Sequence, residues 1–308
     1  MDDYEEPFGW WGWHWQPPVP LSIMQIIDAG STDTDMAAVL WAMLARRASV
    51  LVAAEPPMAG KTTTLTALLD LTPPGTRRVY LRGHYETFDF LRDPRCDPAH
   101  TYVLANEMSD HLAVYLWGSR VYKTFELLEK GYAIGSTMHA ETVQDVIAIL
   151  DSDPLNVPAR WIARLTLVIN LYVSSTYGYG PAVRRFYSVH MLEPDDGGEG
   201  EHAGEHTGEH AGEHTGGANI SRGTIANACS SVPGVRPILL SQWDRASDRF
   251  MHCFHLPEVQ ARLAAWAGLS TQEWAADVSR RRAYLHKMAA DGVRGISATR
   301  AALRQFRA

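Results

Sequence analysis

The segment that most constrains this chain is LVAAEPPMAGKTTTLT, residues 51–66. It begins with a short apolar run of the kind that forms a buried parallel strand, and a helical pattern follows it. Between them, Gly60, Lys61 and Thr62 complete the end of the pattern G-x-x-x-x-G-K-[ST], which is typical of a phosphate-binding loop. The first glycine of that pattern is replaced by Glu55. Strand, loop and helix in this order predict a nucleotide-binding α/β fold.

In a phosphate loop, backbone N–H groups and the start of the following helix surround the phosphates. Lys61 is expected to reach the β- and γ-phosphates, and the Thr62 hydroxyl is expected to ligate Mg²⁺. Because Glu55 precedes the centre of this nest, we expect it to weaken nucleotide binding without abolishing it. The residues expected to contact the nucleotide are Pro57, Met58, Ala59, Gly60, Lys61, Thr62 and Thr63.

The rest of the pattern alternates strand-like and helical segments, which predicts a mostly parallel sheet covered on both faces. Strands are expected at 49–54, 77–83, 100–107, 132–140, 166–175 and 184–194, with further strands in 235–256. Helices are expected within 21–47 and at 63–71, 110–131, 141–152, 159–165 and 257–308, with breaks in the last at Gly268, Gly292 and Gly295.

Polar residues follow two of these strands, where ligands of open α/β sheets bind. Glu107 ends YVLANE and could order Mg²⁺ or polarise the attacking water. His139, with Ser136 and Thr137 before it, ends STMHA and could respond to the γ-phosphate. Taken alone, each is more often a surface carboxylate or a histidine satisfied by a local turn. The upstream phosphate loop favours the functional interpretation.

Four motifs in order resemble the ATPases of type II and type IV secretion systems, including pilus and archaellum motors. They are EPPMAGKTT (55–63), YLRGHYE (80–86), YVLANEMSD (102–110) and GSTMHAE (135–141), matching the family's phosphate loop, acidic box, Walker B strand and His box. The C-terminal sequence 280–306 is similar to the archaellum and tight-adherence types. The resemblance covers about 21–190 and 235–306.

The resemblance implies a RecA-like P-loop ATPase, usually hexameric, that couples hydrolysis of ATP with Mg²⁺ to the movement of pilins or secreted protein. It implies catalytic roles for Glu107, His139 and Glu86, and Mg²⁺ binding by Thr62 and Glu107. It also implies work in the cytoplasm, at the inner face of the membrane, beside a membrane-embedded platform protein. Three widely spaced cysteines and the absence of a secretory signal agree with a cytosolic protein.

The sequence also departs from the family pattern. Asn106 stands where glycine is usual, and Arg82 and Gly83 stand where the acidic box has its paired acids. Those acids help to activate water, so the alternative is a degenerate, non-hydrolysing nucleotide-binding scaffold or regulator. Only about 50 residues precede the loop, so the family's N-terminal domain, which supplies arginines, is expected to be lacking. By position, the arginines that could substitute are Arg82, Arg92 and Arg95.

Composition divides the chain into four parts, expected at 1–20, 21–194, 195–234 and 235–308. The first holds Trp10, Trp11, Trp13 and Trp15 and is read as an arm that packs on its own domain or on a partner. The third repeats Glu-His-Ala/Thr-Gly and is read as a disordered spacer, although His202, His206, His210 and His214 could bind Zn²⁺ or Ni²⁺.

Charge is distributed unevenly along the chain. The total is −7, but 193–217 holds eight acids and no Lys or Arg, whereas 280–308 holds eight Lys and Arg and one acid. A basic helical end could meet nucleic acid or lipid, but it is more often a solvated face or an intersubunit contact. Nucleic acid is therefore not the expected partner, and a nucleic-acid motor is the third interpretation.

Overall fold

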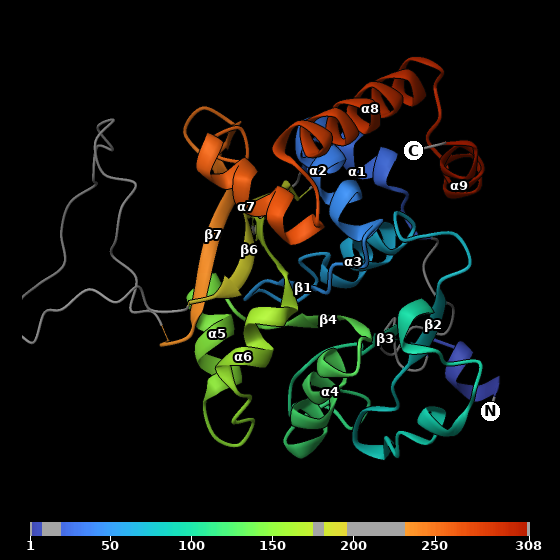
Figure 1. Cartoon of the computed structure of the whole chain (residues 1–308), viewed down its shortest axis with the longest axis vertical. Helices are drawn as coiled ribbons and strands as arrows, with labels where there is room; N and C mark the ends of the chain where they lie inside the picture. The colour runs from blue at the N-terminus through green and yellow to red at the C-terminus, as the bar shows by residue number, and fades with distance from the viewer. Residues whose placement is uncertain (1, 8–19, 175–181, 196–231, 307–308) are drawn as a thin grey trace, which may run out of the picture.

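The computed structural model describes residues 2–7, 20–174, 182–195 and 232–306 (Figure 1). The four tryptophans of the expected arm and the four repeat histidines lie outside the described residues. The interpretations of both segments therefore stay predictions. Within the described part, no helix has the length and apolar character needed to cross a bilayer.

The described chain is built on one sheet with the strand order β2-β3-β4-β1-β5-β6-β7-β8. The first five of these strands pair in parallel and the last three pair antiparallel. The predicted α/β class with a mostly parallel sheet is confirmed. The strands are β1 Val50–Ala53, β2 Arg77–Tyr80, β3 Thr101–Leu104, β4 Ala133–Met138, β5 Leu167–Val173, β6 Arg184–Pro194, β7 Val235–Asp244 and β8 Arg249–His252.

Helices cover both faces of the sheet, as Figure 1 shows. One apolar cluster joins the sheet to α1, α2, α3, α7 and α8, and a second joins it to α4, α5 and α6. Alternate residues of β1 point to opposite faces of the sheet. Val50 and Val52 pack in the first cluster, and Leu51 and Ala53 pack in the second. The helices are α1 Ile23–Asp28, α2 Thr34–Leu44, α3 Lys61–Leu69, α4 Ser119–Glu129, α5 Val143–Asp151, α6 Ala159–Ile162, α7 Pro257–Ala267, α8 Thr271–Ala290 and α9 Ile296–Gln305.

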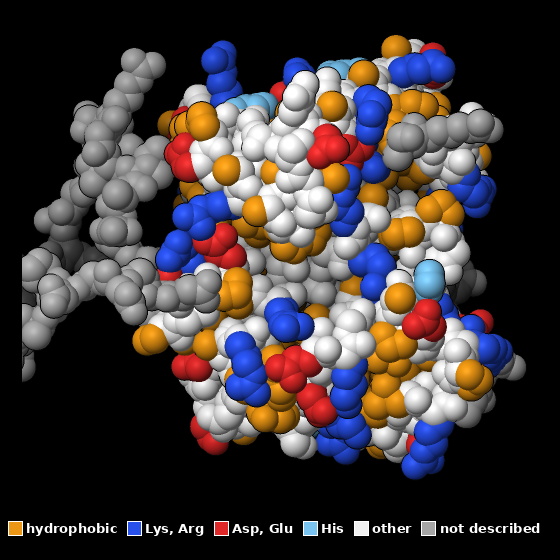
Figure 2. Space-filling model, in the orientation of Figure 1, with side chains coloured by type: hydrophobic (Ala, Val, Ile, Leu, Met, Phe, Trp, Pro, Cys, Tyr) orange, Lys and Arg blue, Asp and Glu red, His pale blue; other side chains and the backbone are white. Residues whose placement is uncertain are grey.

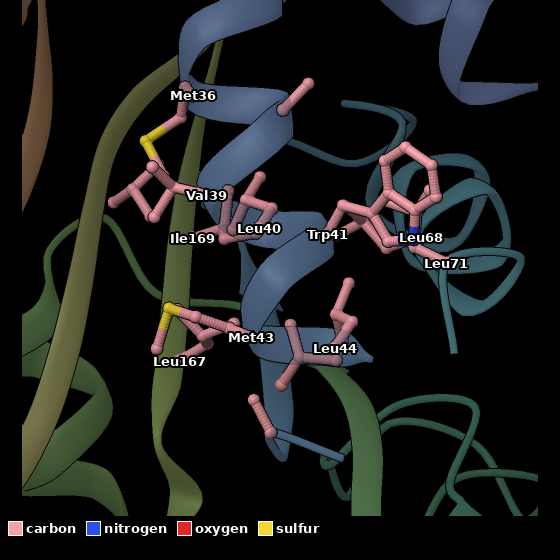
Figure 3. Packing of buried hydrophobic residues seen from close by; sticks show 14 of the residues in the cluster. Met36, Val39, Leu40, Trp41, Met43, Leu44, Leu68, Leu71, Leu167 and Ile169 are labelled. Carbon is pink, nitrogen blue, oxygen red and sulfur yellow. The ribbon is translucent and has the colours of Figure 1, made fainter. Parts of the chain in front are cut away.

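Helix α2 is the centre of the first cluster. Its residues 36–44 are all buried, and Figure 3 shows its side chains directed at β5 on one side and at α3 on another. The Asp33 carboxylate caps its start by accepting the Met36 N–H at 2.9 Å. A helix that is apolar all round needs cover on every face, and α8 supplies the remaining cover.

The expected helix 110–131 is too long, because α4 begins only at Ser119. Leu116 pairs with Met108, and its N–H donates to the Glu107 carbonyl at 2.8 Å, so the chain before α4 turns back along the end of β3. Gly118 has φ 63° and ψ −138°, which a helix cannot contain. The C-terminal breaks at Gly268, Gly292 and Gly295 are confirmed.

The basic C-terminal region is largely neutralised within the molecule. Four arginines of this region form ion pairs with aspartates, and three of these aspartates belong to the N-terminal half. Figure 2 likewise shows Lys and Arg interspersed with Asp and Glu on the face in view. These pairs favour an intramolecular role for the basic helices over nucleic-acid binding. They are Arg281–Asp277 at 3.2 Å, Arg282–Asp35 at 2.5 Å, Arg294–Asp28 at 2.5 Å and Arg300–Asp70 at 2.9 Å.

The expected insert enters and leaves the sheet at one point. Strands β6 and β7 pair from Ser188 with Gln242 to Pro194 with Val235. Beyond that pair, the Asp195 N–H donates to the Gly234 carbonyl at 3.2 Å. The chain therefore leaves β6 and re-enters β7 at neighbouring positions.

The ring of His190 on β6 makes stability depend on pH. Burial lowers the pKa of His190 to about 4, and its Nδ1 is buried without a hydrogen-bond partner among the described residues. Between pH 6.5 and 4 the unfolded chain therefore takes up a proton that the folded chain does not. The free energy of unfolding decreases as the pH is lowered through this range. Because His190 is half-buried as a whole residue, we expect a loss of about 2 kcal/mol rather than the full value of the shift.

Urea unfolding at pH 7 and pH 4 measures this contribution. His190→Leu should lose about 2 kcal/mol less than the native chain over that range. His286→Gln, which changes an exposed histidine of α8, should follow the native chain. An equal loss in all three proteins would show that carboxylates alone set the acid sensitivity.

Candidate nucleotide site

The phosphate loop connects β1 to α3 without the missing glycine. Its left-handed residues are Met58, with φ 57°, and Gly60, with φ 97°. Glu55 is not among the residues with positive φ, and it is exposed. The turn that a first glycine would permit is therefore made at Met58, whose side chain is 86% exposed.

Gly60 precedes the first residue of α3 and leaves the N-terminus of that helix open. No side chain caps this end, and the Gly60 carbonyl accepts the Thr64 N–H at 2.8 Å. The N–H groups of the first helical turn are free of intrahelical partners and carry the positive end of the helix dipole. Lys61, Thr62 and Thr63 lie in this turn, the position at which helix N-termini commonly bind anions.

Lys61 is buried beside two other predicted site residues. Its Nζ lies 3.5 Å from Oε2 of Glu107 and 3.1 Å from Nε2 of His139, and it donates to the Ala54 carbonyl at 3.4 Å. Burial lowers the pKa of Lys61, while the charges of Glu107 and Glu55 raise it. Glu55 therefore acts on the site through its charge, by favouring the protonated lysine.

The ends of β3 and β4 position Glu107 and His139. Beyond β3 the chain continues along β4, with Ala105 donating to Gly135 at 3.0 Å and Met108 donating to Thr137 at 2.8 Å. This pairing brings Glu107 to the end of β4, where Oε1 lies 3.3 Å from Nε2 of His139. Sheet order thus unites Lys61, Glu107 and His139, which stand far apart in the sequence.

The two hydroxyl residues before His139 have structural partners instead. Thr137 is fully buried, and its Oγ1 donates to the Asn106 carbonyl at 2.8 Å. Ser136 is also buried, and its Oγ donates to the Thr137 carbonyl at 3.3 Å. The Thr137 bond holds the end of β4 to the segment after β3, and His139 is the residue of STMHA whose side chain contacts Lys61.

Glu86 lies in a separate turn. Its Oε1 accepts hydrogen bonds from the Tyr4 hydroxyl at 2.8 Å and from the Phe88 N–H, and its Oε2 accepts one from the Arg82 N–H at 2.8 Å. No contact in the described part of the chain joins Glu86 to Lys61, Glu107 or His139. The observed bonds stabilise the turn, and a catalytic role for Glu86 stays a prediction.

Gly83 explains why the expected acidic box departs from its pattern. A Cβ at this position would lie 2.4 Å from the Val114 carbonyl carbon and 2.6 Å from the Ala113 oxygen, and φ is +59°. Backbone atoms cannot move aside as a flexible side chain can. The segment that closes over Glu107 thus rests directly on Gly83, and a carboxylate side chain has no room there.

The arginines expected from position have partners close in the sequence. Arg92 pairs with Asp89 at 3.1 Å and Arg95 with Asp93 at 2.8 Å, and the Arg82 guanidinium lies over the Tyr4 ring at 5.7 Å. None of these contacts reaches the phosphate loop.

Arg184, at the start of β6, contacts the loop, and sequence reasoning missed it. Its Nη2 donates to the Met58 carbonyl at 3.3 Å, and its Cδ would be 3.4 Å from a Cβ at Gly60. Beside it lies a cavity of about 190 Å³ whose lining includes Gly60, Thr63 and Arg184. Strand β6 runs antiparallel to β5, and β5 pairs with β1, so the start of β6 lies near the loop that follows β1. This strand pairing is the signal that could have pointed to Arg184.

Comparisons with known proteins give limited similarity. No protein-family profile matches the chain. An uncharacterised protein of Methanocaldococcus jannaschii is 28% identical over 200 residues, which covers 57% of this chain and 34% of that protein. The chain therefore spans about one third of the length of this relative.

Two kinds of solved structure are also similar. The VirB11 ATPase of the Brucella suis type IV secretion system is 17% identical, with a TM-score of 0.36 over 53% of each chain. The DotB ATPase of Legionella pneumophila is 13% identical, with a TM-score of 0.37 over 56% of this chain and 52% of that one.

The close approach at Gly83 predicts a large cost for restoring an acid. We expect Gly83→Asp to lower the free energy of unfolding by about 3 kcal/mol or more, from the backbone clash and the positive φ together. Gly75→Asp is the matched control, because Gly75 has φ +82° but a Cβ at this position would meet no atom within 4 Å.

The control should lose only about 1 kcal/mol, the cost of the backbone conformation. Urea denaturation of both variants measures the difference. Equal losses in the two variants would show that the contact with 113–114 is not constraining.

Proposed function

We propose that this chain binds ATP with Mg²⁺ at the loop 57–63 and hydrolyses it. One observation carries the proposal: Lys61, Glu107 and His139 meet within 3.5 Å beside the open N-terminus of α3. A phosphate chain at that helix end meets free N–H groups and an ammonium group, the two features that bind phosphate in P-loop proteins. Lys61 then exchanges its contact with the Ala54 carbonyl for phosphate oxygens.

The residues at the site fit Mg²⁺. Oε1 of Glu107 is buried and receives no hydrogen bond from any described residue, and Thr62 offers a hydroxyl from the first turn of α3. Carboxylate and hydroxyl oxygens are the hard ligands that Mg²⁺ takes, together with water and phosphate oxygens. When bound, Mg²⁺ neutralises charge on the phosphates. Thr62 and Glu107 are the residues that would hold it.

The geometry also supports roles for the remaining groups. Glu107 is the carboxylate closest to Lys61, and it is placed to accept a proton from, or to orient, the attacking water. His139 donates from Nδ1 to the Glu55 carbonyl at 2.8 Å, which fixes the ring and directs Nε2 at Glu107 and Lys61. The imidazole therefore reports changes at the phosphates to the loop itself.

The work that hydrolysis drives is proposed from the order of the four motifs. Phosphate loop, acidic box, Walker B strand and His box follow one another as in the secretion ATPases. We infer a hexamer that moves pilins or secreted protein, in the cytoplasm and at the inner face of a membrane, beside a membrane-embedded platform protein. Division of the chain into an arm, a core, an insert and a C-terminal region belongs to the same proposal.

A second function is favoured by one observation. Gly83 cannot be replaced by the acid that the acidic box would supply, and Glu86 is bonded within its own turn. A chain without those acids binds nucleotide but activates water poorly. The second candidate is therefore a non-hydrolysing, nucleotide-gated scaffold or regulator of such a machine.

Substitution of Lys61 and Glu107 separates the two functions. We expect Lys61→Ala to weaken ATP binding at least about tenfold, because a charge-assisted contact to phosphate is lost. We expect Glu107→Gln to leave binding within about threefold and to lower the rate of phosphate release by about a hundredfold or more. Equilibrium binding and steady-state phosphate release measure these effects.

Lys287→Ala, an exposed lysine of α8, is the matched control and should behave as the native chain. Lys61-dependent binding with no phosphate release by the native chain would establish the scaffold. Absence of binding at millimolar ATP would overturn both functions.

Arg184 is expected to add to nucleotide affinity. Its guanidinium is exposed and lies against the loop, so Arg184→Ala should weaken ATP binding about three- to tenfold and leave turnover at saturating ATP within twofold. Arg249→Ala, an exposed arginine of β8, is the control. A large fall in turnover with unchanged binding would instead place Arg184 at the transferred phosphate.

A further inference from the structure

A cluster of three metal-binding side chains lies at the edge of the proposed nucleotide site. Glu107, His111 and His139 each present one ligand atom, and these atoms all lie within 4.8 Å of one another. The rings of His111 and His139 have their centroids 5.9 Å apart. His111 lies on the segment that turns back over the end of β3, and nothing in the sequence motifs had assigned it a role.

The protonation of His139 is set by its neighbour. A backbone carbonyl only accepts hydrogen bonds, so the contact of Nδ1 with the Glu55 carbonyl at 2.8 Å places a proton on Nδ1. In the neutral ring, Nε2 then carries a lone pair. Histidines that bind metals are oriented in this way, with the second ring nitrogen donating to a carbonyl or carboxylate.

That lone pair faces an oxygen of Glu107. Nε2 of His139 and Oε1 of Glu107 lie 3.3 Å apart, which is close to the roughly 3.4 Å between two ligands of a tetrahedral Zn²⁺. Glu107 is only 7% exposed, and Oε1 is buried without a hydrogen bond within the described ranges. The Lys61 ammonium already contacts both groups, at 3.1 Å from Nε2 of His139 and 3.5 Å from Oε2 of Glu107, so a metal cation would compete with this ammonium for the same two ligands.

His111 is free to complete the set. Its side chain is 66% exposed, and Asp110 lies 3.7 Å from its Nε2. One ring nitrogen of His111 already lies within 4.8 Å of the ligand atoms of Glu107 and His139. Two imidazoles and one carboxylate favour Zn²⁺, Co²⁺ or Ni²⁺ over Mg²⁺, which prefers oxygen ligands in an octahedron.

We propose that Glu107, His111 and His139 form a transition-metal site that excludes the nucleotide. A metal there occupies the carboxylate and the imidazole that the nucleotide site uses, and it places a divalent charge beside the Lys61 ammonium. The exclusion rests on the proposed function, whereas the metal site does not. A chain of this kind would be held inactive by zinc and released when zinc is withdrawn.

Zinc titration by calorimetry and the absorption spectrum of bound Co²⁺ test the site without nucleotide. The full-length chain is used with the four repeat histidines changed to glutamine, so that they contribute no binding. We expect one equivalent of Zn²⁺ to bind and Co²⁺ to give the intense visible bands of a tetrahedral site. His111→Gln in this background should weaken Zn²⁺ binding at least tenfold, and His286→Gln should not.

Zinc binding that is unaffected by His111→Gln, or an octahedral Co²⁺ spectrum, would overturn the proposal. Exclusion is read from ATP binding with and without Zn²⁺ in the same two backgrounds. ATP itself chelates zinc to the same extent in both, so the effect of the site is an additional weakening of ATP binding that only the native His111 background should show. Zinc binding that depends on His111 in a chain that never binds ATP would support the metal site and reject the proposed function.

Discussion

The site depends on the contacts that the buried Lys61 ammonium makes with its neighbours. Removing a charge from water is costly unless an opposite charge and hydrogen-bond acceptors receive it. Here the partners come from Glu107 beyond β3, His139 beyond β4 and a carbonyl at the end of β1. They can meet only because β4 lies between β3 and β1, so the order of the sheet and the chemistry of the loop are one requirement.

The departures from the motif pattern have geometric explanations. Replacing the first glycine by Glu55 is tolerated because the left-handed turn lies at Met58. Gly83 replaces an acid because the backbone of 113–114 occupies the space of a side chain. Both changes lie outside the contact between Lys61 and Glu107, which is retained. The loop thus differs from the pattern before Gly60, whereas the N-terminus of α3 remains open, with no side-chain cap.

Local patterns were sufficient to predict much of this fold. The buried strands and the glycine breaks near the C-terminus follow from apolar runs and from the helix-breaking tendency of glycine, which act over a few residues. The helix expected at 110–131 was too long because LAVYLW fits a helical pattern, whereas Leu116 finds its partner in Met108. Arg184 and His111 were missed for the same reason, since their neighbours are set by strand pairing and not by spacing.

The hydrogen bond between Asp195 and Gly234 makes the β6–β7 hairpin complete without the segment between them. In general, the entropic cost of closing a flexible loop rises by only about 0.6 kcal/mol for each doubling of its length. Repeats of four residues can therefore be gained or lost at this point while the sheet and the nucleotide site keep their stability. The end of the hairpin is therefore a position at which the length of the chain can change during evolution, and at which a folded domain could be inserted.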